Sequence, residues 1–155
     1  MAVVKRKKTN RACVIGLDGV PFGMIVELAR RGVMSTMARL MDIGKIHQMR
    51  ASLPEISAVS WTDFMTGTDS GTHGIFGFTD FKPKSYGIRF PNYLDVMAPT
   101  LWDKLGAKGK KSIVINQPST YPARKTDGIL ISGFVALELA KAVWPMSYRA
   151  ALEQM

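Results

Sequence analysis

Residues 12–19 read ACVIGLDG, and this stretch decides the fold that the sequence predicts. Residues 12–17 form a continuous apolar run, which is typical of a strand buried on both faces of a parallel sheet. Asp18 and Gly19 stand at the C-terminal end of that strand. Pro21 then suits the first turn of a helix, where its missing N–H would have no acceptor anyway. The stretch therefore predicts a strand followed directly by a helix.

The same alternation recurs along the chain. The predicted strands are 12–17, 46–50, 111–116 and 128–132. The predicted helices start at Pro21, near Ser35, at Ser57 or Ala58 and at about Thr100, and residues 137–155 are helix-prone with a break at Pro145. Residues 68–87 are rich in glycine and turn-forming residues, so we expect them to be mostly loop. Strands that alternate with helices indicate a layered α/β fold with a mainly parallel sheet.

The composition is that of a single globular domain. The 155 residues are 46% hydrophobic and 21% charged, which is typical of a chain with a buried core. No apolar run approaches the ~20 residues of a membrane-spanning helix, and no signal-peptide pattern follows the N-terminus. Cys13 is the only cysteine, so no disulfide can form within the chain. We therefore expect a cytoplasmic protein in which Cys13 is a small apolar residue of the first strand.

A cluster of positive charges opens the chain, whose net charge is +9. The cluster consists of Lys5, Arg6, Lys7, Lys8 and Arg11. Such a cluster can bind nucleic acid or another anionic surface. We prefer to interpret residues 1–11 as a flexible, solvated tail, because no zinc-ligand spacing, helix-turn-helix pattern or RNA-binding signature accompanies them.

Residues 53–67, LPEISAVSWTDFMTG, hold the hydroxyl with the strongest case for chemistry. If a helix begins at Ser57 or Ala58, the Ser57 hydroxyl lies among backbone N–H groups at the positive end of the helix dipole. That position suits a bound phosphate or a serine nucleophile, although spacing alone favours a serine that only caps the helix. The other hydroxyls are interpreted as phosphate neighbours, helix surface or loop caps (Ser60, Thr62, Thr66), and the large apolar residues as core (Trp61, Phe64, Met65).

Asp18 and His73 are the other side chains with a case for chemistry. An aspartate at the C-terminal edge of a parallel sheet is a common ligand of divalent cations, because carboxylate oxygens are hard donors. An aspartate before glycine is also common in plain turns. His73 lies between glycines in a predicted loop, where histidine can be a ligand or an acid/base group. We interpret His73 as a residue that locks the loop through a backbone hydrogen bond, and His47 as structural.

Together these pieces resemble the alkaline phosphatase superfamily. The resemblance rests on VIGLDGV (14–20), LPEISAVSWTDFMTGTDSGTHGIFGFTDF (53–81), APTLWDKLGAKGKKSIVINQPSTYPAR (98–124) and GILISGF (128–134). The nearest branch is the type I phosphodiesterase/nucleotide pyrophosphatase-like group of phosphohydrolases and phosphomutases. The resemblance covers the chain from about Ala12 to Pro145. It implies a three-layer α/β/α fold with a mainly parallel sheet, of which this chain holds an incomplete part.

The resemblance also implies roles for individual residues. The metal-binding aspartate after the family's first strand corresponds to Asp18. The family's Ser or Thr nucleophile stands ten residues before the glycine of a T-G pair; that glycine is Gly67 here, so the nucleophile corresponds to Ser57, which the family also uses as a metal ligand. Ser60 replaces a phosphate-binding asparagine of nucleotide pyrophosphatases, so phosphate contacts are expected to differ and a nucleotide substrate is not supported. His73 matches a histidine that we take as structural.

Family members run to several hundred residues, and their remaining ligands, two aspartates and three histidines, come from the second half. We therefore expect residues 12–155 to be the N-terminal part of a metal-dependent phosphohydrolase that is inactive alone. Zinc, manganese and magnesium all remain open as the metal, and the expected substrate is a small phosphate ester. Two alternatives are a stand-alone module that binds anions or nucleic acid, and one chain of a two-chain enzyme whose C-terminal half is encoded separately.

Overall fold

The computed structural model describes residues 11–154. Contacts divide the chain into two compact units, one up to Met49 and one from Arg50 onward. Among residues 11–154, no helix is long and apolar enough to cross a membrane.

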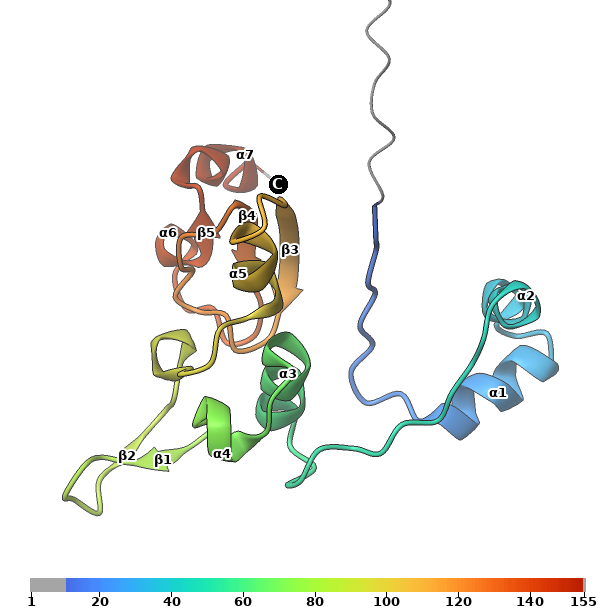
Figure 1. Ribbon diagram of the computed structural model, residues 1–155, viewed down its shortest axis with the longest axis horizontal. Helices are drawn as coiled ribbons and strands as arrows, with labels where there is room; N and C mark the ends of the chain where they lie inside the picture. The colour runs from blue at the N-terminus through green and yellow to red at the C-terminus, as the bar shows by residue number, and fades with distance from the viewer. Residues whose placement is uncertain (1–10, 155) are drawn as a thin grey trace, which may run out of the picture. The chain divides into compact units, whose positions relative to one another are not determined.

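The first unit is built on a pair of packed helices, α1 (Phe22–Arg30) and α2 (Ser35–Ile43) (Figure 1). Gly32 follows α1 in the left-handed region, at φ +75°, and its N–H donates to the Ala29 carbonyl. Glycine is the usual residue there because it lacks the Cβ that disfavours this conformation. Both predicted helices are therefore confirmed, although Ser35 is the first helical residue of α2 and not its cap.

The strands predicted for residues 12–17 and 46–50 do not form. Both segments are irregular chain, and their side chains are exposed. Ile15 is 81% exposed, and Cys13 is exposed as well. An apolar run becomes a strand only when a neighbouring strand pairs with its backbone groups, and sequence pattern alone cannot supply that neighbour.

The second unit contains all of the structure's strands and most of its helices. In chain order its elements are α3 (Ser57–Thr66), α4 (Ser70–His73), β1 (Asp80–Phe81), β2 (Ile88–Arg89), the 3₁₀ turn η1 (Tyr93–Asp95), α5 (Leu101–Gly106), β3 (Ser112–Gln117), β4 (Gly128–Ser132), α6 (Leu139–Ala142), β5 (Val143–Trp144), the 3₁₀ turn η2 (Met146–Tyr148) and α7 (Arg149–Leu152). The predicted loop over residues 68–87 thus contains the short helix α4 and most of a β-hairpin.

The main sheet of this unit has the order β3-β4-β5. Strands β3 and β4 are parallel, as predicted from their two apolar runs. Strand β5 adds to β4 in the antiparallel sense, and it was not predicted because it lies in a helix-prone segment. The α/β class is confirmed, whereas a three-layer architecture and a mainly parallel sheet are not.

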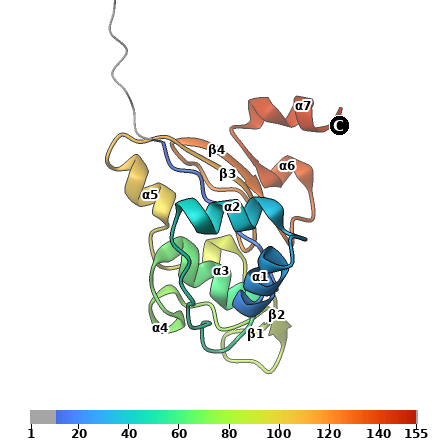
Figure 2. The same cartoon turned by 90° about the vertical axis from the view of Figure 1, so that its right-hand side faces the viewer.

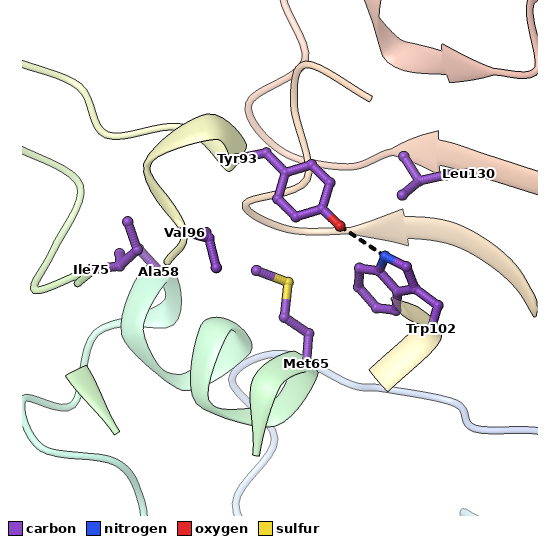
Figure 3. Close-up of a cluster of buried hydrophobic side chains, with 7 residues drawn as sticks. All are labelled: Ala58, Met65, Ile75, Tyr93, Val96, Trp102 and Leu130. Atoms are coloured by element: carbon purple, nitrogen blue, oxygen red, sulfur yellow. Dashed lines mark hydrogen bonds between the residues drawn. The ribbon is translucent and has the colours of Figure 1, made fainter. Parts of the chain in front are cut away.

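Helix α3 and the sheet contribute to one buried cluster, which is drawn in Figure 3. The cluster consists of Ala58, Met65, Ile75, Tyr93, Val96, Trp102 and Leu130. Within it, the Trp102 Nε1–H donates to the Tyr93 hydroxyl at 2.8 Å. A buried indole N–H needs such a partner, because an unpaired donor in an apolar core costs about 1–3 kcal/mol. The core therefore links α3, η1, α5 and the sheet into one body.

Candidate active site at the start of helix α3

Helix α3 begins at Ser57, and the extended residue Ile56 precedes it as the cap. The N–H groups of Val59 and Ser60 both donate to the Ile56 carbonyl, at 2.9 Å each. Ser57 is therefore the first helical residue, at the end of the helix where backbone N–H groups point outward and the dipole is positive. This placement agrees with the start at Ser57 or Ala58 that the sequence predicted.

Buried threonines fix the body of α3. The Thr62 hydroxyl donates to the Ala58 carbonyl at 2.6 Å, and the Thr66 hydroxyl donates to the Thr62 carbonyl at 2.7 Å. Bonds of this kind satisfy a hydroxyl inside a helix without an external partner. Thr62 is thus interior and not helix surface, while Thr66 also accepts a bond from the Thr68 hydroxyl and so caps the following loop, as one of the interpretations proposed.

The C-terminal end of α3 is held from two sides. Gly67 adopts the left-handed conformation, with φ +68°, and its N–H donates to the Asp63 carbonyl. The Lys104 ammonium group, from α5, donates to the Thr66 carbonyl at 2.5 Å. A cation at this end complements the negative pole of the helix dipole. Ser57 lies at the opposite end of the helix, where backbone N–H groups point outward.

The middle of α3 lies beside the C-terminal end of a parallel strand. Gln117, the last residue of β3, donates from its amide to the Trp61 carbonyl at 3.3 Å. In parallel α/β sheets, functional groups gather beyond this edge of the strands. Ser57 precedes Trp61 by about one helical turn, so the candidate nucleophile stands on the helix that packs at this edge.

A buried histidine joins α3 to α4. The His73 ring is fully buried, and its Nδ1 accepts from the Ile75 N–H at 3.1 Å. Because Nδ1 is an acceptor, the ring proton lies on Nε2, which donates to the Asp63 carboxylate at 2.6 Å. The prediction that His73 locks its loop through a backbone hydrogen bond is confirmed. The link to Asp63 was not foreseen, since nothing in the spacing shows that the loop folds back onto α3.

A second polar cluster, missed from the sequence, lies just beyond β3 and β4. The Thr120 hydroxyl donates to the Gln117 carbonyl at 2.6 Å, and the Ser132 hydroxyl donates to the Thr120 carbonyl at 2.7 Å. All three residues are buried. The two hydroxyls are satisfied within the cluster, which therefore supports the loop after β3. The run QPST directly after an apolar strand was the available signal.

The predicted site residues fall into both units. Ser57 and Ser60 lie one turn apart on α3, and both are half-buried. Within residues 11–154 the Ser60 hydroxyl has no hydrogen-bond partner, which suits a group that contacts a ligand. Asp18 lies in the other unit, where it forms an exposed turn with Gly19 at φ +66° and not the end of a strand.

The outcomes differ for the predicted basic tail and for the apolar residues of α3 that were predicted as core. Of the basic tail, Lys5, Arg6, Lys7 and Lys8 lie outside the described residues, and Arg11 is exposed. Of the large apolar residues of α3, Met65 is fully buried, but Phe64 is 47% exposed and is not core. Phe64 instead packs edge-on against Trp61 at a ring-centre distance of 5.9 Å.

Comparison with known proteins identifies the family of the chain. A family model described as type I phosphodiesterase / nucleotide pyrophosphatase matches residues 12–154. The chain belongs to this family. The resemblance to the alkaline phosphatase superfamily, read from the motifs, is thereby confirmed. Comparisons with curated proteins and with solved structures give no match.

Membership of the type I phosphodiesterase family places the protein among phosphoester hydrolases. The family is generally metal-dependent. Among residues 11–154, however, no three side chains of His, Cys, Asp or Glu are grouped so that they could hold a metal ion. Zinc takes four protein or water ligands, and magnesium takes six.

Proposed function

We propose that the protein is the nucleophile-bearing part of a phosphoester hydrolase, in which the Ser57 hydroxyl attacks phosphorus. The observation that carries the proposal is the position of Ser57 as the first residue of α3 in a chain of the type I phosphodiesterase family. A serine at a helix start can meet a phosphoryl group at the place where backbone N–H groups favour its negative charge. The substrate class is a small phosphate ester.

Residues of this chain can be assigned to the attack on phosphorus and to the stabilisation of the phosphoryl oxygens. The Ser57 hydroxyl loses its proton to solvent and its oxygen forms a bond to phosphorus, while the ester oxygen leaves with the bonding electron pair and takes up a proton from solvent. Negative charge is spread over the phosphoryl oxygens, where the N–H groups at the start of α3 and the Ser60 hydroxyl can donate to them. Water then cleaves the phosphoserine and restores the hydroxyl. Transfer to the hydroxyl of a second substrate, in place of water, would make the protein a phosphomutase.

The metal site is proposed to be shared with residues beyond those described. Asp18 is the carboxylate that we propose as a metal ligand, and the Ser57 hydroxyl is the second donor. Zinc sites usually have three or four protein ligands, which is more than these two donors supply. We propose that the other ligands come from a C-terminal half, either in a longer chain or as a separate polypeptide. The chain alone would then be inactive or nearly so, and its cytoplasmic location stays a prediction.

The experiment is a hydrolysis assay on the purified chain, with an aryl phosphate monoester and an aryl phosphate diester. Zinc, manganese and magnesium are added in turn, and Ser57→Ala is compared with Ser60→Ala. Turnover that is lost in Ser57→Ala and only reduced in Ser60→Ala would support Ser57 as nucleophile and refute the need for further ligands. Turnover that survives Ser57→Ala would refute Ser57 as nucleophile.

Absence of turnover would support the need for further ligands, and a binding measurement then tests the site itself. Titration with inorganic phosphate should show weaker binding to Ser57→Ala, by about fivefold for one lost hydrogen bond. Thr68→Ala, which removes a half-buried hydroxyl beyond the far end of α3, is the matched control and should bind as the parent does. Equal phosphate binding by all three proteins would refute a phosphate site at the start of α3.

A further inference from the structure

The hairpin of β1 and β2 carries large apolar side chains that nothing in the second unit covers. Phe81 stands directly opposite Ile88 in the antiparallel ladder, so the two side chains lie on the same face. Phe81 is 64% exposed and Ile88 is 63% exposed. Tyr86, in the connecting turn, is 95% exposed, and Phe90, directly after β2, is 76% exposed. A folded protein rarely gathers so many exposed apolar side chains in one short segment without an interaction to make there.

The opposite face of the hairpin is tied to the rest of the unit. Asp80 and Arg89 form the other cross-strand pair, and the Arg89 Nη2 lies 2.7 Å from the Asp80 carboxylate. The Arg89 Nη1 lies 2.5 Å from the Asp95 carboxylate in η1. Because side chains alternate between the two faces of a strand, anchoring Arg89 to η1 turns the Phe81–Ile88 face outward. The exposure of that face is therefore a consequence of specific pairing on the other.

The connecting turn holds two cations in a defined backbone. The Lys82 N–H donates to the Gly87 carbonyl at 2.7 Å, and the Ser85 N–H donates back to the Lys82 carbonyl at 3.1 Å. Within residues 11–154, the ammonium groups of Lys82 and Lys84 form no ion pair. An open hollow of about 600 Å³ lies at this turn, lined by Phe81, Lys82, Pro83, Lys84, Ser85 and Tyr86. The end of the hairpin thus combines unneutralised positive charge with aromatic side chains.

Figures 1 and 2 both show the hairpin turned away from the main sheet of its unit. We propose that this hairpin docks on an anionic phospholipid bilayer. Aromatic side chains such as Phe81 and Tyr86 favour the boundary between headgroups and acyl chains. Each lysine near a negative lipid surface strengthens binding about fivefold. Lys82 directly follows Phe81, and Lys84 stands two residues before Tyr86, so cationic and aromatic side chains would reach the same lipid surface.

A bilayer fits this hairpin better than a single-stranded nucleic acid does. Nucleic-acid platforms stack successive bases on aromatic rings along a cationic groove. Here the residue opposite Phe81 is Ile88, an aliphatic side chain that offers no ring for stacking. The two unpaired lysines are confined to the end of the hairpin and do not mark out a path along it. Insertion into a lipid interface requires only apolar area and nearby cations, and the hairpin has both.

The test is cosedimentation of the full chain with phosphatidylcholine vesicles that contain or lack phosphatidylserine. We expect binding only when phosphatidylserine is present. Phe81→Ser/Ile88→Ser should weaken it about tenfold, and Lys82→Gln/Lys84→Gln should weaken it about thirtyfold. The controls are Leu137→Ser, which changes an exposed apolar side chain outside the hairpin, and Lys108→Gln/Lys110→Gln, which removes two exposed lysines after α5. Both controls should bind as the parent chain does.

Other outcomes would overturn the proposal. If the hairpin variants bind vesicles as well as the parent, the basic residues elsewhere in the chain account for the attraction. Equal losses in the hairpin and control variants would show general charge or folding effects. A single-stranded oligonucleotide whose binding depends on the hairpin, while vesicle binding does not, would assign the surface to nucleic acid. If Phe81→Ser/Ile88→Ser does not melt as the parent does, Tyr86→Ser replaces it, because that side chain has almost no contacts to lose.

Discussion

The α3–α4 segment and the β1–β2 hairpin follow one another in the chain and are built in opposite ways. In the first, polar side chains turn inward: Thr62 and His73 are fully buried and hydrogen-bonded. In the second, the charged pair Asp80–Arg89 lies near the surface, and Phe81 faces solvent beside Ile88. The comparison shows that the hydrophobicity of a residue type does not by itself decide whether its side chain is buried. Burial depends on the partners that tertiary packing supplies.

The contrast has a functional side. The α3–α4 segment is a rigid support that fixes the helix carrying Ser57, because its hydroxyl and imidazole groups are satisfied within the segment. The hairpin keeps its apolar face and two lysines available. Substitutions in the first segment should therefore change stability most, and substitutions in the hairpin should leave stability almost unchanged.

The largest expected loss of stability comes from truncating a buried side chain of α3. Met65→Ala should lower the free energy of unfolding by about 2–5 kcal/mol, since a fully buried side chain leaves a cavity. Phe81→Ala, the matched control in the hairpin, should change it by less than about 0.5 kcal/mol. Urea unfolding followed by tryptophan fluorescence measures both, because all three tryptophans lie in the second unit. Similar losses of unfolding free energy in the two variants would show that the two segments contribute equally to stability.

The next effect comes from the buried imidazole. His73→Ala should cost about 2–3 kcal/mol of unfolding free energy, because it removes the partners of both Asp63 and the Ile75 N–H. His73→Asn keeps an acceptor near the position of Nδ1, and His73→Gln keeps a donor near that of Nε2. Each should recover part of the loss in the same urea experiment. A His73→Ala protein as stable as the parent would show that the α3–α4 link is not structural.

A smaller effect is expected at Tyr93. Tyr93→Phe leaves the Trp102 N–H unpaired and should lower the unfolding free energy by about 1–2 kcal/mol at neutral pH. Burial raises the pKa of the Tyr93 phenol above its usual 10. The neutral phenol's contribution is therefore complete below pH 10 and is lost as pH rises through the higher folded pKa. Above pH 10, stability should fall less steeply in Tyr93→Phe than in the parent, and parallel slopes would contradict a buried, neutral Tyr93.

The smallest effect belongs to the charged face of the hairpin. Asp80→Asn should cost only about 0.2–1 kcal/mol, because the Asp80–Arg89 pair is partly exposed and screened by water and salt. Thermal melts at low and high salt should show this difference shrinking as salt rises. Thr79→Ser, next to Asp80 and exposed, is a neutral control. A loss comparable with that of His73→Ala would mean that the hairpin is part of the core and not an appended surface.

Local patterns predicted several elements of this protein well. The runs KSIVIN and GILIS became the parallel pair β3 and β4, because unbroken apolar β-formers between turn residues have few other stable uses. Gly32 and Gly44 end α1 and α2, as glycine does at many helix ends. Helix α3 starts at Ser57, one of the two starts considered from the sequence. Each of these inferences depends on residues that are close in sequence.

What tertiary structure decided depends on partners distant in the chain. The run at 12–17 is at least as apolar as β3 yet forms no strand, because a strand requires a neighbouring strand that pairs with its backbone. Strand β5 formed in a helix-prone segment because β4 offered it an edge. His73 contacts Asp63, and Arg89 contacts both Asp80 and Asp95. The spacing of these residues in the sequence does not indicate these contacts. The sequence by itself determined helix ends, apolar runs and the candidate nucleophile; tertiary structure determined which polar groups are satisfied inside and which apolar faces stay outside.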